Sequence, residues 1–512
     1  MFTYLSLACR FLRSAVSSRC DVALRRQLVV ITRSSRRPRL TRADRLFWSW
    51  LSRAWLRSRS ALVIVQPDTV VRWQRTAWRK LLLAALLAVS LPTVACQEGS
   101  AVTAIATAGG SGTAENAGVT DTEIKIGTLL PLSQNVGAAW GVAIAEGMKA
   151  YDDYINDQGG VYGRKIRLIV EDQQGSPPVA AEAARRLVEQ DKVFAIQGSL
   201  GLGTHSAVWK YLEERGIPDM YVLDGDPKWT DPVVRTRFGF LVDYITEGRI
   251  LGKYIADNYD GRKLGIIAQN DDFGKEEETG LRTGIDEQGA HMEIAVEYYD
   301  ETQTDITGQV QRLKAENVAV IALVGTPVQA ASLFKTARES LRWNVPVVLT
   351  GVDAAEVTAT LAGYDNIEGA VTVVFGHQAF ETEVPGVARH HEIMAQYAPG
   401  ITPDNLTLVG QTISEAMVGL LEQAGPNPTR ESFLDAAESV CNYLCSTCLT
   451  PSSTTSTDHR PAEVEVYVRA TVDRSTNPPT FWWQPFGEPF GFESTKECVT
   501  PTPPPGYQAQ PK

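Results

Sequence analysis

Residues 124–172 constrain the fold of this chain more than any other stretch. Ile124–Leu130 is an apolar run rich in branched side chains, a composition typical of a buried parallel strand. Apolar residues then recur at helical spacing over residues 143–155, a pair of glycines follows, and residues 166–170 form a second apolar run. A strand–helix–strand unit of this length crosses over right-handed and starts a doubly wound sheet, in which ligands bind at the carboxyl ends of the strands.

The alternation of strand and helix patterns continues along the chain and restarts once. Residues 238–242 read as a connecting strand, and the helix and strand patterns begin again from Thr246. The second series runs to a strand at residues 347–349, with a further strand at residues 369–375. A restart of this kind predicts a second parallel sheet, so we expect an α/β protein with two similar doubly wound lobes.

The distribution of charge limits the possible partners. The chain has 512 residues, more than one hydrophobic core usually serves. Residues 1–80 carry 18 Lys and Arg against 3 Asp, or +15, which leaves −26 on the remainder of a chain whose net charge is −11. An acidic body is poorly suited to binding phosphate backbones, so we expect no nucleic-acid partner.

The first 78 residues differ in composition from the rest. They are rich in Arg and Trp and contain no Lys, and residues 46–73 hold the phrase LFWSW … LVIVQPDTVVRW. This segment resembles the N-terminal part of integrase-type transposases, but a leader-like sequence follows it where their catalytic core would begin. We interpret residues 1–78 as a basic extension without function, either a transposase remnant or the result of an early start codon. A working DNA-binding domain is the alternative.

Residues 79–96 have the organisation of a secretory leader. Two basic residues precede a short apolar run that ends in Val-Ala-Cys96, and this run is too short for an obvious membrane span. The ending resembles the lipoprotein signal, in which Cys96 would become the lipid-modified first residue of the mature protein. Thr93 departs from the usual Leu, so simple secretion is the alternative. Residues 97–120 are rich in small residues and suit a flexible linker.

Four cysteines cluster late in the chain: Cys441, Cys445, Cys448 and Cys498. In an exported protein four cysteines indicate two disulfides, with three possible pairings. The alternative is a four-thiolate zinc site, but a C-x3-C-x2-C run with its last Cys fifty residues later matches ordinary zinc spacing poorly. We therefore expect disulfides and no metal site.

Six phrases in the body of the chain carry a resemblance to one family. They are IKIGTLLPLSQNVGAAWG, INDQGGVYGRKIRLIVEDQQGSP, AARRLVEQDKVFAIQGSLGLGT, ITEGRILGKYI, IIAQNDDFGKE and STDHRP. In this order they resemble the extracytoplasmic solute-binding proteins of the Leu/Ile/Val-binding type, which feed ABC importers. The resemblance covers residues 121–490. It implies the type I periplasmic binding protein fold, in which two doubly wound lobes joined by three hinge segments close on a small ligand.

The resemblance also implies domain limits. Hinge crossings are expected near Leu241, Phe375 and Thr454, and a strand at residues 463–470 would return to the second lobe. The expected ranges are 121–240 and 376–453 for the first lobe, 241–375 and 454–490 for the second lobe, and 491–512 for a disordered tail.

Candidate ligand contacts of the first lobe follow its strands. Trp140 stands where the family places a Trp against the ligand side chain. Gly201, Gly203 and Thr204 lie in the loop that presents backbone and hydroxyl groups to the ligand in the family. Gly201 and Leu202 occupy the usual Ser positions of this loop, so the contact to an amino acid carboxylate is altered. The alternatives are core packing for the Trp ring and a tight strand-to-helix turn for the loop.

Further candidates follow later strands. Gly225 occupies a position where amino acid binders of the family have Thr, and Asp224 beside it could pair with a ligand or cap a turn. Phe273 matches an aromatic residue that lines the second lobe's side of the cleft. Thr326 and Asp353 lie in loops after second-lobe strands, where polar side chains either contact the ligand or are simply solvated.

The sequence therefore predicts a secreted or lipid-anchored receptor that delivers a small polar ligand to the permease subunits of an ABC importer. The altered loops at Gly201 and Gly225 favour a carboxylate other than an amino acid, or an aromatic compound, at least as much as leucine, and amides are further ligands of the family. No nucleophile with a positioned base is evident, and GSLGLG is neither a P-loop nor a dinucleotide loop. We expect no enzyme activity and no cofactor. An extracytoplasmic sensor for a signalling partner is the alternative function.

Overall fold

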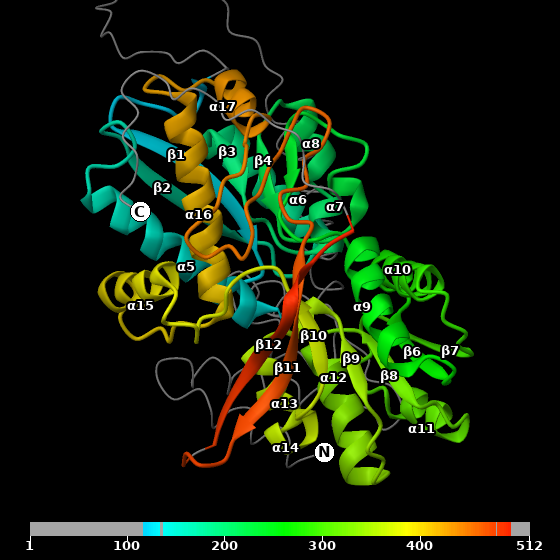
Figure 1. Ribbon diagram of the computed structural model, residues 1–512. Coiled ribbons are helices and arrows are strands. Elements are labelled where there is room, and N and C mark those ends of the chain that lie inside the picture. The colour runs from blue at the N-terminus through cyan, green and yellow to red at the C-terminus, as the bar shows by residue number, and fades with distance from the viewer. Residues whose placement is uncertain (1–115, 134–136, 478, 493–512) are drawn as a thin grey trace, which may run out of the picture. The chain divides into compact units, whose positions relative to one another are not determined.

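The computed structural model describes residues 116–133, 137–477 and 479–492. The predictions for the basic extension, for the leader with Cys96, and for most of the linker and the tail with Cys498 lie outside these residues. Two sheets organise the described chain, and helices flank each of them (Figure 1). We call each sheet with its helices a lobe, and we number the lobes in chain order.

The first sheet has five parallel strands in the order β2-β1-β3-β4-β5. Its strands are β1 (Glu123–Leu130), β2 (Lys165–Asp172), β3 (Ala195–Gln197), β4 (Asp219–Val222) and β5 (Arg237–Gly239). The last five residues of β1 are all buried, as expected of a parallel strand covered on both faces. The strand order reverses between β1 and β3, and such a reversal leaves a crevice at the carboxyl ends of the two strands.

Seven α-helices within the described residues belong to the first lobe. They are α5 (Ala138–Asp157), α6 (Pro177–Arg185), α7 (Leu202–Ser206), α8 (Trp209–Glu214), α15 (Pro385–Tyr397), α16 (Asn405–Ala424) and α17 (Arg430–Ala437). A π-helical turn extends α6 to Asp191. α7 and α8 are two separate short helices.

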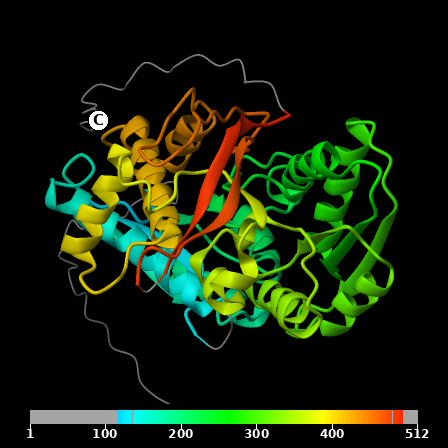
Figure 2. The ribbon, with the colours of Figure 1, turned by 60° about the horizontal axis from the view of Figure 1, so that its bottom comes forward.

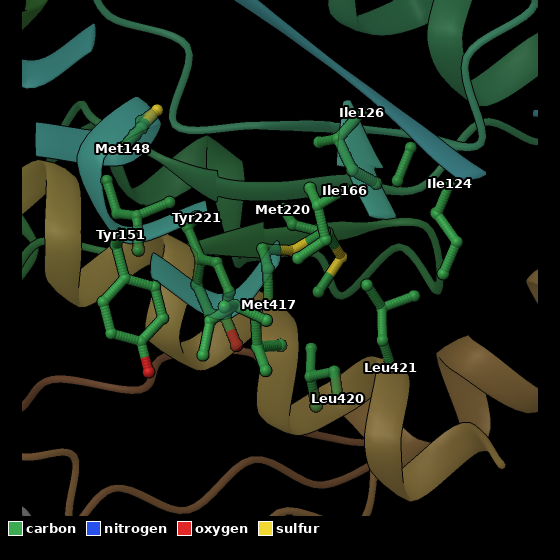
Figure 3. Close-up of a cluster of buried hydrophobic side chains, with 14 of the residues drawn as sticks. Ile124, Ile126, Met148, Tyr151, Ile166, Met220, Tyr221, Met417, Leu420 and Leu421 are labelled. Atoms are coloured by element: carbon green, nitrogen blue, oxygen red, sulfur yellow. The ribbon is translucent and has the colours of Figure 1, made fainter. Parts of the chain in front are cut away.

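The helices α5 and α16 pack tightly against each other beside the first sheet (Figure 1). Glycines allow the close approach, because a Cβ at Gly147 would lie 2.0 Å from the carbonyl oxygen of Thr407. A Cβ at Gly410 would likewise lie 2.2 Å from the carbonyl oxygen of Ile144. The core of the lobe forms between these helices and the sheet (Figure 3), from residues that include Ile124, Ile126, Met148, Tyr151, Ile166, Met220, Tyr221, Met417, Leu420 and Leu421.

The second sheet has seven strands in the order β12-β11-β10-β9-β8-β6-β7. Its strands are β6 (Leu264–Gln269), β7 (Ile294–Tyr299), β8 (Val320–Val324), β9 (Val347–Leu349), β10 (Val371–Val374), β11 (Glu465–Asp473) and β12 (Thr480–Phe490). The strands from β7 to β10 are parallel and repeat the order of the first sheet. β11 and β12 form an antiparallel hairpin at the edge (Figure 2). The predicted fold class is confirmed, with this hairpin added to the parallel sheet.

Six α-helices within the described residues belong to the second lobe. They are α9 (Tyr244–Tyr259), α10 (Asp272–Glu287), α11 (Thr307–Ala315), α12 (Pro327–Phe334), α13 (Glu356–Ala362) and α14 (Tyr364–Ile367). The sequence pattern predicted neither α13 nor α14, which are too short for a clear helical period. It also missed β12, because Pro485 and Pro489 lie within it; both are tolerated because the strand lies at the sheet edge.

The chain passes between the lobes three times. The first crossing follows β5, which is a fifth strand of the first sheet rather than a free connection. The second crossing runs from β10 to α15, and its Gly376 pairs with Cys448.

The third crossing lies later than the expected position at Thr454. The backbone N–H of Thr454 donates to the carbonyl oxygen of Val440, and its hydroxyl donates to that of Ala437 at 2.5 Å, so Thr454 still packs on the first lobe. The chain stays on β5 as far as His459, whose carbonyl oxygen accepts from Gly239 N–H at 3.3 Å. The crossing therefore falls in residues 460–464, directly before β11.

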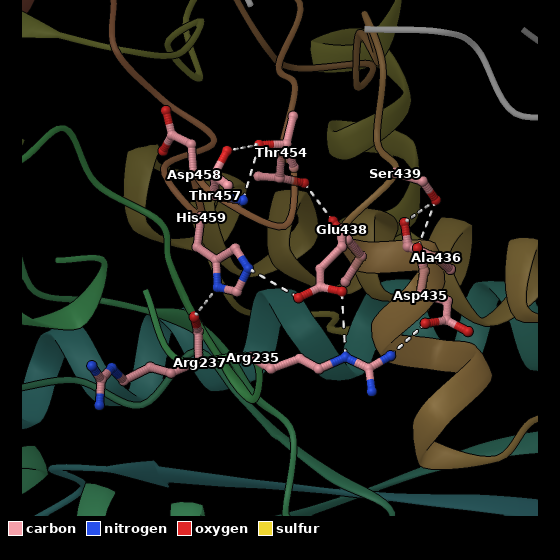
Figure 4. Close-up of polar contacts among 12 residues, drawn as sticks. Arg235, Arg237, Asp435, Ala436, Glu438, Ser439, Thr454, Thr457, Asp458 and His459 are labelled. Carbon is pink, nitrogen blue, oxygen red and sulfur yellow. Dashed lines mark hydrogen bonds and ion pairs between the residues drawn. The ribbon is translucent and has the colours of Figure 1, made fainter. Parts of the chain in front are cut away.

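A polar network holds this return point to the first lobe (Figure 4). The ring of His459 is fully buried, hydrogen-bonds through Nδ1 to the carbonyl oxygen of Arg237 at 2.8 Å, and stacks on Phe238 with the centroids 3.8 Å apart. Its Nε2 lies 3.6 Å from Glu438, which also pairs with Arg235 at 3.3 Å. The first and third crossings therefore leave the first lobe from neighbouring points.

Candidate functional site

A cavity of about 850 Å³ lies between the lobes and is lined by residues of both. The lining includes residues just beyond the carboxyl ends of β1, β3 and β4 in the first lobe and of β6, β8 and β9 in the second. In each lobe these ends include the pair between which the strand order reverses. The doubly wound topology therefore places the cavity where such sheets bind ligands.

The floor of the cavity is apolar and comes from the crossing segments. Phe240, Leu241 and Val242 line it from the first crossing, and Val374 and Phe375 from the second. The rings of Phe240 and Phe375 meet edge to face, with their centroids 5.5 Å apart. An apolar part of a ligand would therefore rest on the segments about which the lobes could hinge.

The first-lobe wall contains four of the predicted contacts: Trp140, Gly201, Gly203 and Thr204. Trp140 lies half-buried in the first turn of α5, facing the cavity rather than the core. Gly201 has φ +113°, a backbone angle that favours glycine. The Thr204 hydroxyl donates to the carbonyl oxygens of Leu200 and Gly201, at 3.2 and 3.1 Å, so it shapes the loop itself.

Asp224 also lines this wall, whereas Gly225 does not. One oxygen of Asp224 accepts from the backbone N–H of Asp226 at 2.9 Å and from Trp229 Nε1 at 2.6 Å, so the carboxylate caps a turn and still borders the cavity. Burial raises its pKa to about 6, although the hydrogen bond from Trp229 works in the opposite direction. A Cβ at Gly225 would lie 2.6 Å from the Tyr244 ring, so this glycine lets α9 approach.

In the second-lobe wall Phe273 and Thr326 line the cavity, whereas Asp353 does not. The Phe273 ring lies 4.7 Å from that of Tyr244, centroid to centroid. The Thr326 hydroxyl donates to Gln329 Oε1 at 2.5 Å. Asp353 is completely buried behind the wall, where burial raises its pKa well above the usual range. The structure thus brings seven of the nine predicted contacts to one cavity and leaves Gly225 and Asp353 outside its lining.

Sequence reasoning missed two carboxyl groups of the second-lobe wall, Glu247 on α9 and Glu465 on β11. Glu247 is 6% exposed and accepts a hydrogen bond from the backbone N–H of Gly351 at 2.6 Å. Glu465 is 2% exposed, and its Oε2 has no hydrogen-bond partner. The available signal was that Glu247 falls on the apolar face of its helix with Tyr244 and Leu251, which is an unusual position for a carboxylate.

A disulfide joins Cys445 to Cys448, and Cys448 borders the cavity. Cys441 also takes part in a disulfide, and Cys498 lies outside the described residues. The pairing of Cys445 with Cys448 excludes the zinc alternative for these two thiols. One of the two predicted disulfides is therefore identified with both its partners.

A family model described as "Periplasmic binding protein" matches residues 123–474. The Leu/Ile/Val-binding protein BraC3 of Rhizobium johnstonii is 25% identical over 321 residues, which cover 61% of this chain and 83% of that protein. A solved fatty acid ABC transporter substrate-binding protein from Thermomonospora curvata has 24% identity and a TM-score of 0.63, covering 73% of this chain and 94% of that one. A branched chain amino acid ABC transporter structure from Thermus thermophilus with bound valine has 18% identity and a TM-score of 0.64, covering 73% and 98%.

A cleft between two such sheets defines a two-lobed solute-binding protein. More particularly, the chain belongs to the periplasmic binding protein family, and the resemblance to Leu/Ile/Val-binding proteins is confirmed. It is a binding protein rather than an enzyme. The family implies an extracytoplasmic place of action. Within the described ranges, the structure has no helix with both the length and the apolar character needed to cross a membrane.

Proposed function

We propose that this chain is the solute-binding component of an ABC importer, which closes its two lobes on a small ligand and presents the closed form to the permease subunits. The observation that carries this proposal is the cavity itself, with walls from both lobes and a floor from the crossing segments. A ligand in that position contacts both lobes and the crossing segments between them. Its binding energy can therefore favour the closed arrangement of the lobes.

We assign the ligand contacts by wall. Trp140 from the first lobe and Phe273 from the second would hold the apolar body of the ligand by ring contacts. The loop from Gly201 to Thr204 would offer backbone N–H groups at the start of α7, and Asp224 and Thr326 would offer polar side chains. Gly225 and Asp353 would act indirectly, by shaping the walls from behind.

We propose an amino acid, an amide, or an aromatic or other carboxylic acid as the ligand class. The cavity volume of about 850 Å³ falls in the range of roughly 300–1,000 Å³ that is usual for small-molecule sites. The apolar floor favours a ligand with a substantial apolar body. Of two proteins similar in structure, one is described as a fatty acid ABC transporter substrate-binding protein and the other was solved with bound valine, which supports this range of ligands.

We propose that the receptor is held at the membrane by a lipid on Cys96, after removal of the leader and everything before it. A second disulfide, between Cys441 and Cys498, would accompany export. N-terminal analysis of the protein from the cell envelope tests the anchor: the expected product begins at lipid-modified Cys96. A product that retains residues 1–78 would contradict it.

The proposal is tested by a thermal-shift screen over amino acids, amides and aromatic acids, followed by small-angle scattering with each compound that shifts the melt. A ligand at a hundredfold excess over its Kd should stabilise the fold by about 2.7 kcal/mol, and the radius of gyration should fall. Trp140→Ala should weaken binding at least tenfold, whereas Trp482→Ala, on a strand outside the cavity, should leave it unchanged. If no solute shifts the melt or compacts the protein, the proposal fails.

A further inference from the structure

Three buried carboxyl groups lie together in the second lobe, where α9, α10 and β11 meet behind the cavity wall. Glu247 and Glu465 line the cavity, and Glu277 lies directly behind Glu247. Glu277 is fully buried, and neither of its carboxyl oxygens has a hydrogen-bond partner outside the cluster. The Oε2 atom of Glu465 is also buried and without a partner, on a side chain that borders the cavity.

Within the described residues, the cation closest to this cluster in the network of ion pairs, Arg460, pairs with Asp243 at 3.8 Å rather than with Glu247, Glu277 or Glu465. The charged groups that most affect Glu247, Glu277 and Glu465 are carboxyl groups: the three act on one another, and Asp243 acts on all of them. Burial is the largest cause that raises the pKa of Glu277 and Glu465 well above the usual range, and the neighbouring carboxyl groups add to it. Burial thus favours the protonated forms of these carboxyl groups, and a cation in the cavity would favour the ionised form of the groups that it touches.

The first-lobe wall carries an acidic group too, and a further carboxyl group of the second lobe lies close to it. Asp224 borders the cavity from the first lobe, and Asp226 lies two residues beyond it. Glu276 on α10 is close enough to both for their charges to act on it, and burial together with Asp226 raises the pKa of Glu276 to about 8. The one lysine that lines the cavity, Lys228, is already paired with Asp226. Closure of the lobes would bring Asp224 closer to the carboxyl groups of the second lobe, and a cation between them would favour their ionised forms.

We propose that the ligand of this receptor is an organic cation, an ammonium or guanidinium compound with an apolar body, whose charge lies against Glu247 and Glu465. The inference rests on the proposed function, because it takes the cavity as the ligand site, and it replaces the broader ligand class proposed above with a cationic one. The apolar floor holds the body of the ligand, and the second-lobe wall receives its charge. The attraction of one cation to acidic groups on both walls then favours the closed arrangement.

The test compares pairs of compounds that differ in charge but little in shape. The probes are phenethylamine against 3-phenylpropanoate and 3-phenylpropanamide, and L-arginine against L-citrulline, each measured by titration calorimetry at pH 7.5. We expect at least one cationic member to bind at least tenfold more tightly than its neutral or anionic partners.

Glu→Gln variants test which side chains contact the charged group of the ligand. Glu465→Gln and Glu247→Gln should each weaken binding of the cation at least tenfold and leave any binding of its neutral partner within twofold. Glu465→Gln should remain folded, because it removes a buried ionisable group that has an unpaired oxygen. Glu287→Gln is the matched control: it removes one negative charge from α10 at its ion pair with Arg249, outside the cavity lining, and should leave binding unchanged.

The outcomes separate this inference from the proposed function. Tighter binding of the neutral or anionic members overturns the inference and leaves the receptor function intact, because a solute still binds. Equal affinity for the cation in wild type, Glu465→Gln and Glu247→Gln also overturns it. If none of the probes binds, the inference falls, and scattering over the wider solute panel then decides the proposed function.

Discussion

Asp152 shows how one carboxyl group can make stability depend on pH. It lies on the face of α5 that packs against α16, is 4% exposed, and has one oxygen without a hydrogen-bond partner. Burial raises its pKa from 3.8 to about 8, and a hydrogen bond with Ser414 opposes only part of that shift. Asp152 is therefore neutral in the folded protein over a range where it is ionised in the unfolded chain.

The sign of the pH effect follows from this difference. Between pH 3.8 and about 8 the folded protein holds a proton at Asp152 that the unfolded chain has lost, so the free energy of unfolding falls as pH rises across the window and levels off above it. We expect a contribution on the order of 1 kcal/mol per pH unit. In Asp152→Asn this contribution should be absent, as measured by urea unfolding at several pH values.

The control is Asp300→Asn, at an exposed position in the second lobe. It should keep the wild-type pH dependence. An Asp152→Asn variant whose stability falls with pH as steeply as that of wild type would contradict the assignment.

Single residues also show the limits of sequence reasoning at the site. Trp140 and Phe273 were predicted as contacts from the phrases around them, and both line the cavity, although their role in binding stays a prediction. Glu247 and Glu465 could not be predicted in the same way. They come from α9 and from β11, more than 200 residues later, and only the packed second lobe brings them together.

At the scale of elements, the contact between α5 and α16 depends on glycine. The nearest atoms to a Cβ at Gly147 or Gly410 are backbone atoms of the partner helix, which cannot move aside as a flexible side chain can. The two helices carry much of the first-lobe core between them (Figure 3). Any side chain at either glycine would therefore separate the helices.

Gly147→Ala should lower the free energy of unfolding by about 3 kcal/mol, at the upper end of what overpacking costs. Gly308→Ala on α11 is the matched control, because the nearest atom to its Cβ would be the mobile end of Arg312 at 3.3 Å. That variant should be neutral or more stable by up to about 1 kcal/mol, since Ala favours helix. Chemical denaturation of the two variants makes the comparison, and equal stabilities would contradict the packing argument.

The segment that contains the disulfide connects the late cysteines to the cavity. Cys448 pairs with Gly376 of the second crossing, and Thr447 and Cys448 both border the cavity. The Thr447 hydroxyl also lies 2.6 Å from that of Thr412 on α16. The disulfide thus fixes a piece of wall that spans a crossing and a helix.

Replacement of both Cys445 and Cys448 by Ser should cost about 2 kcal/mol of stability, as expected for so short a disulfide loop. It should also weaken ligand binding severalfold, because the wall at Thr447 is no longer fixed. Calorimetry with the best ligand of the screen measures the second effect. Unchanged affinity in the double variant would show that this segment does not shape the site.

At the scale of the whole described chain, the point where the third crossing leaves the first lobe is held by His459. Its ring is enclosed by Phe238 and by polar partners from β5 and the end of α17 (Figure 4). His459 thus contacts the chain next to both the first and the third crossing. Its loss should affect both folding and hinge closure.

His459→Ala should lower the free energy of unfolding by about 2–4 kcal/mol, from the lost ring packing and the lost hydrogen bond to Arg237. It should also broaden the distribution of lobe separations in small-angle scattering without ligand. His291→Ala, at an exposed position before β7, is the control and should change neither quantity. A stable variant with a wild-type scattering profile would show that the hinge does not depend on this ring.

Local sequence patterns were enough to predict the two doubly wound lobes. Their signal is local, since a buried parallel strand and an amphipathic helix each leave a pattern within a dozen residues, and β1 with α5 shows it clearly. The family phrases added the expectation that Trp140 and Phe273 line one cleft. None of this required knowledge of which distant segments touch.

Three features could not be predicted from local patterns and appear only in the tertiary structure. They are the later position of the third crossing, the place of β12 at the sheet edge, and the carboxyl cluster of Glu247, Glu277 and Glu465. Each depends on contacts between residues far apart in the chain. In the sequence, a carboxyl group on an apolar helix face is only one polar residue in an apolar pattern. Its neighbours become known only when the adjacent helix and strand have been placed. Its burial beside other carboxyl groups, which favours a positively charged ligand, exists only in the folded protein.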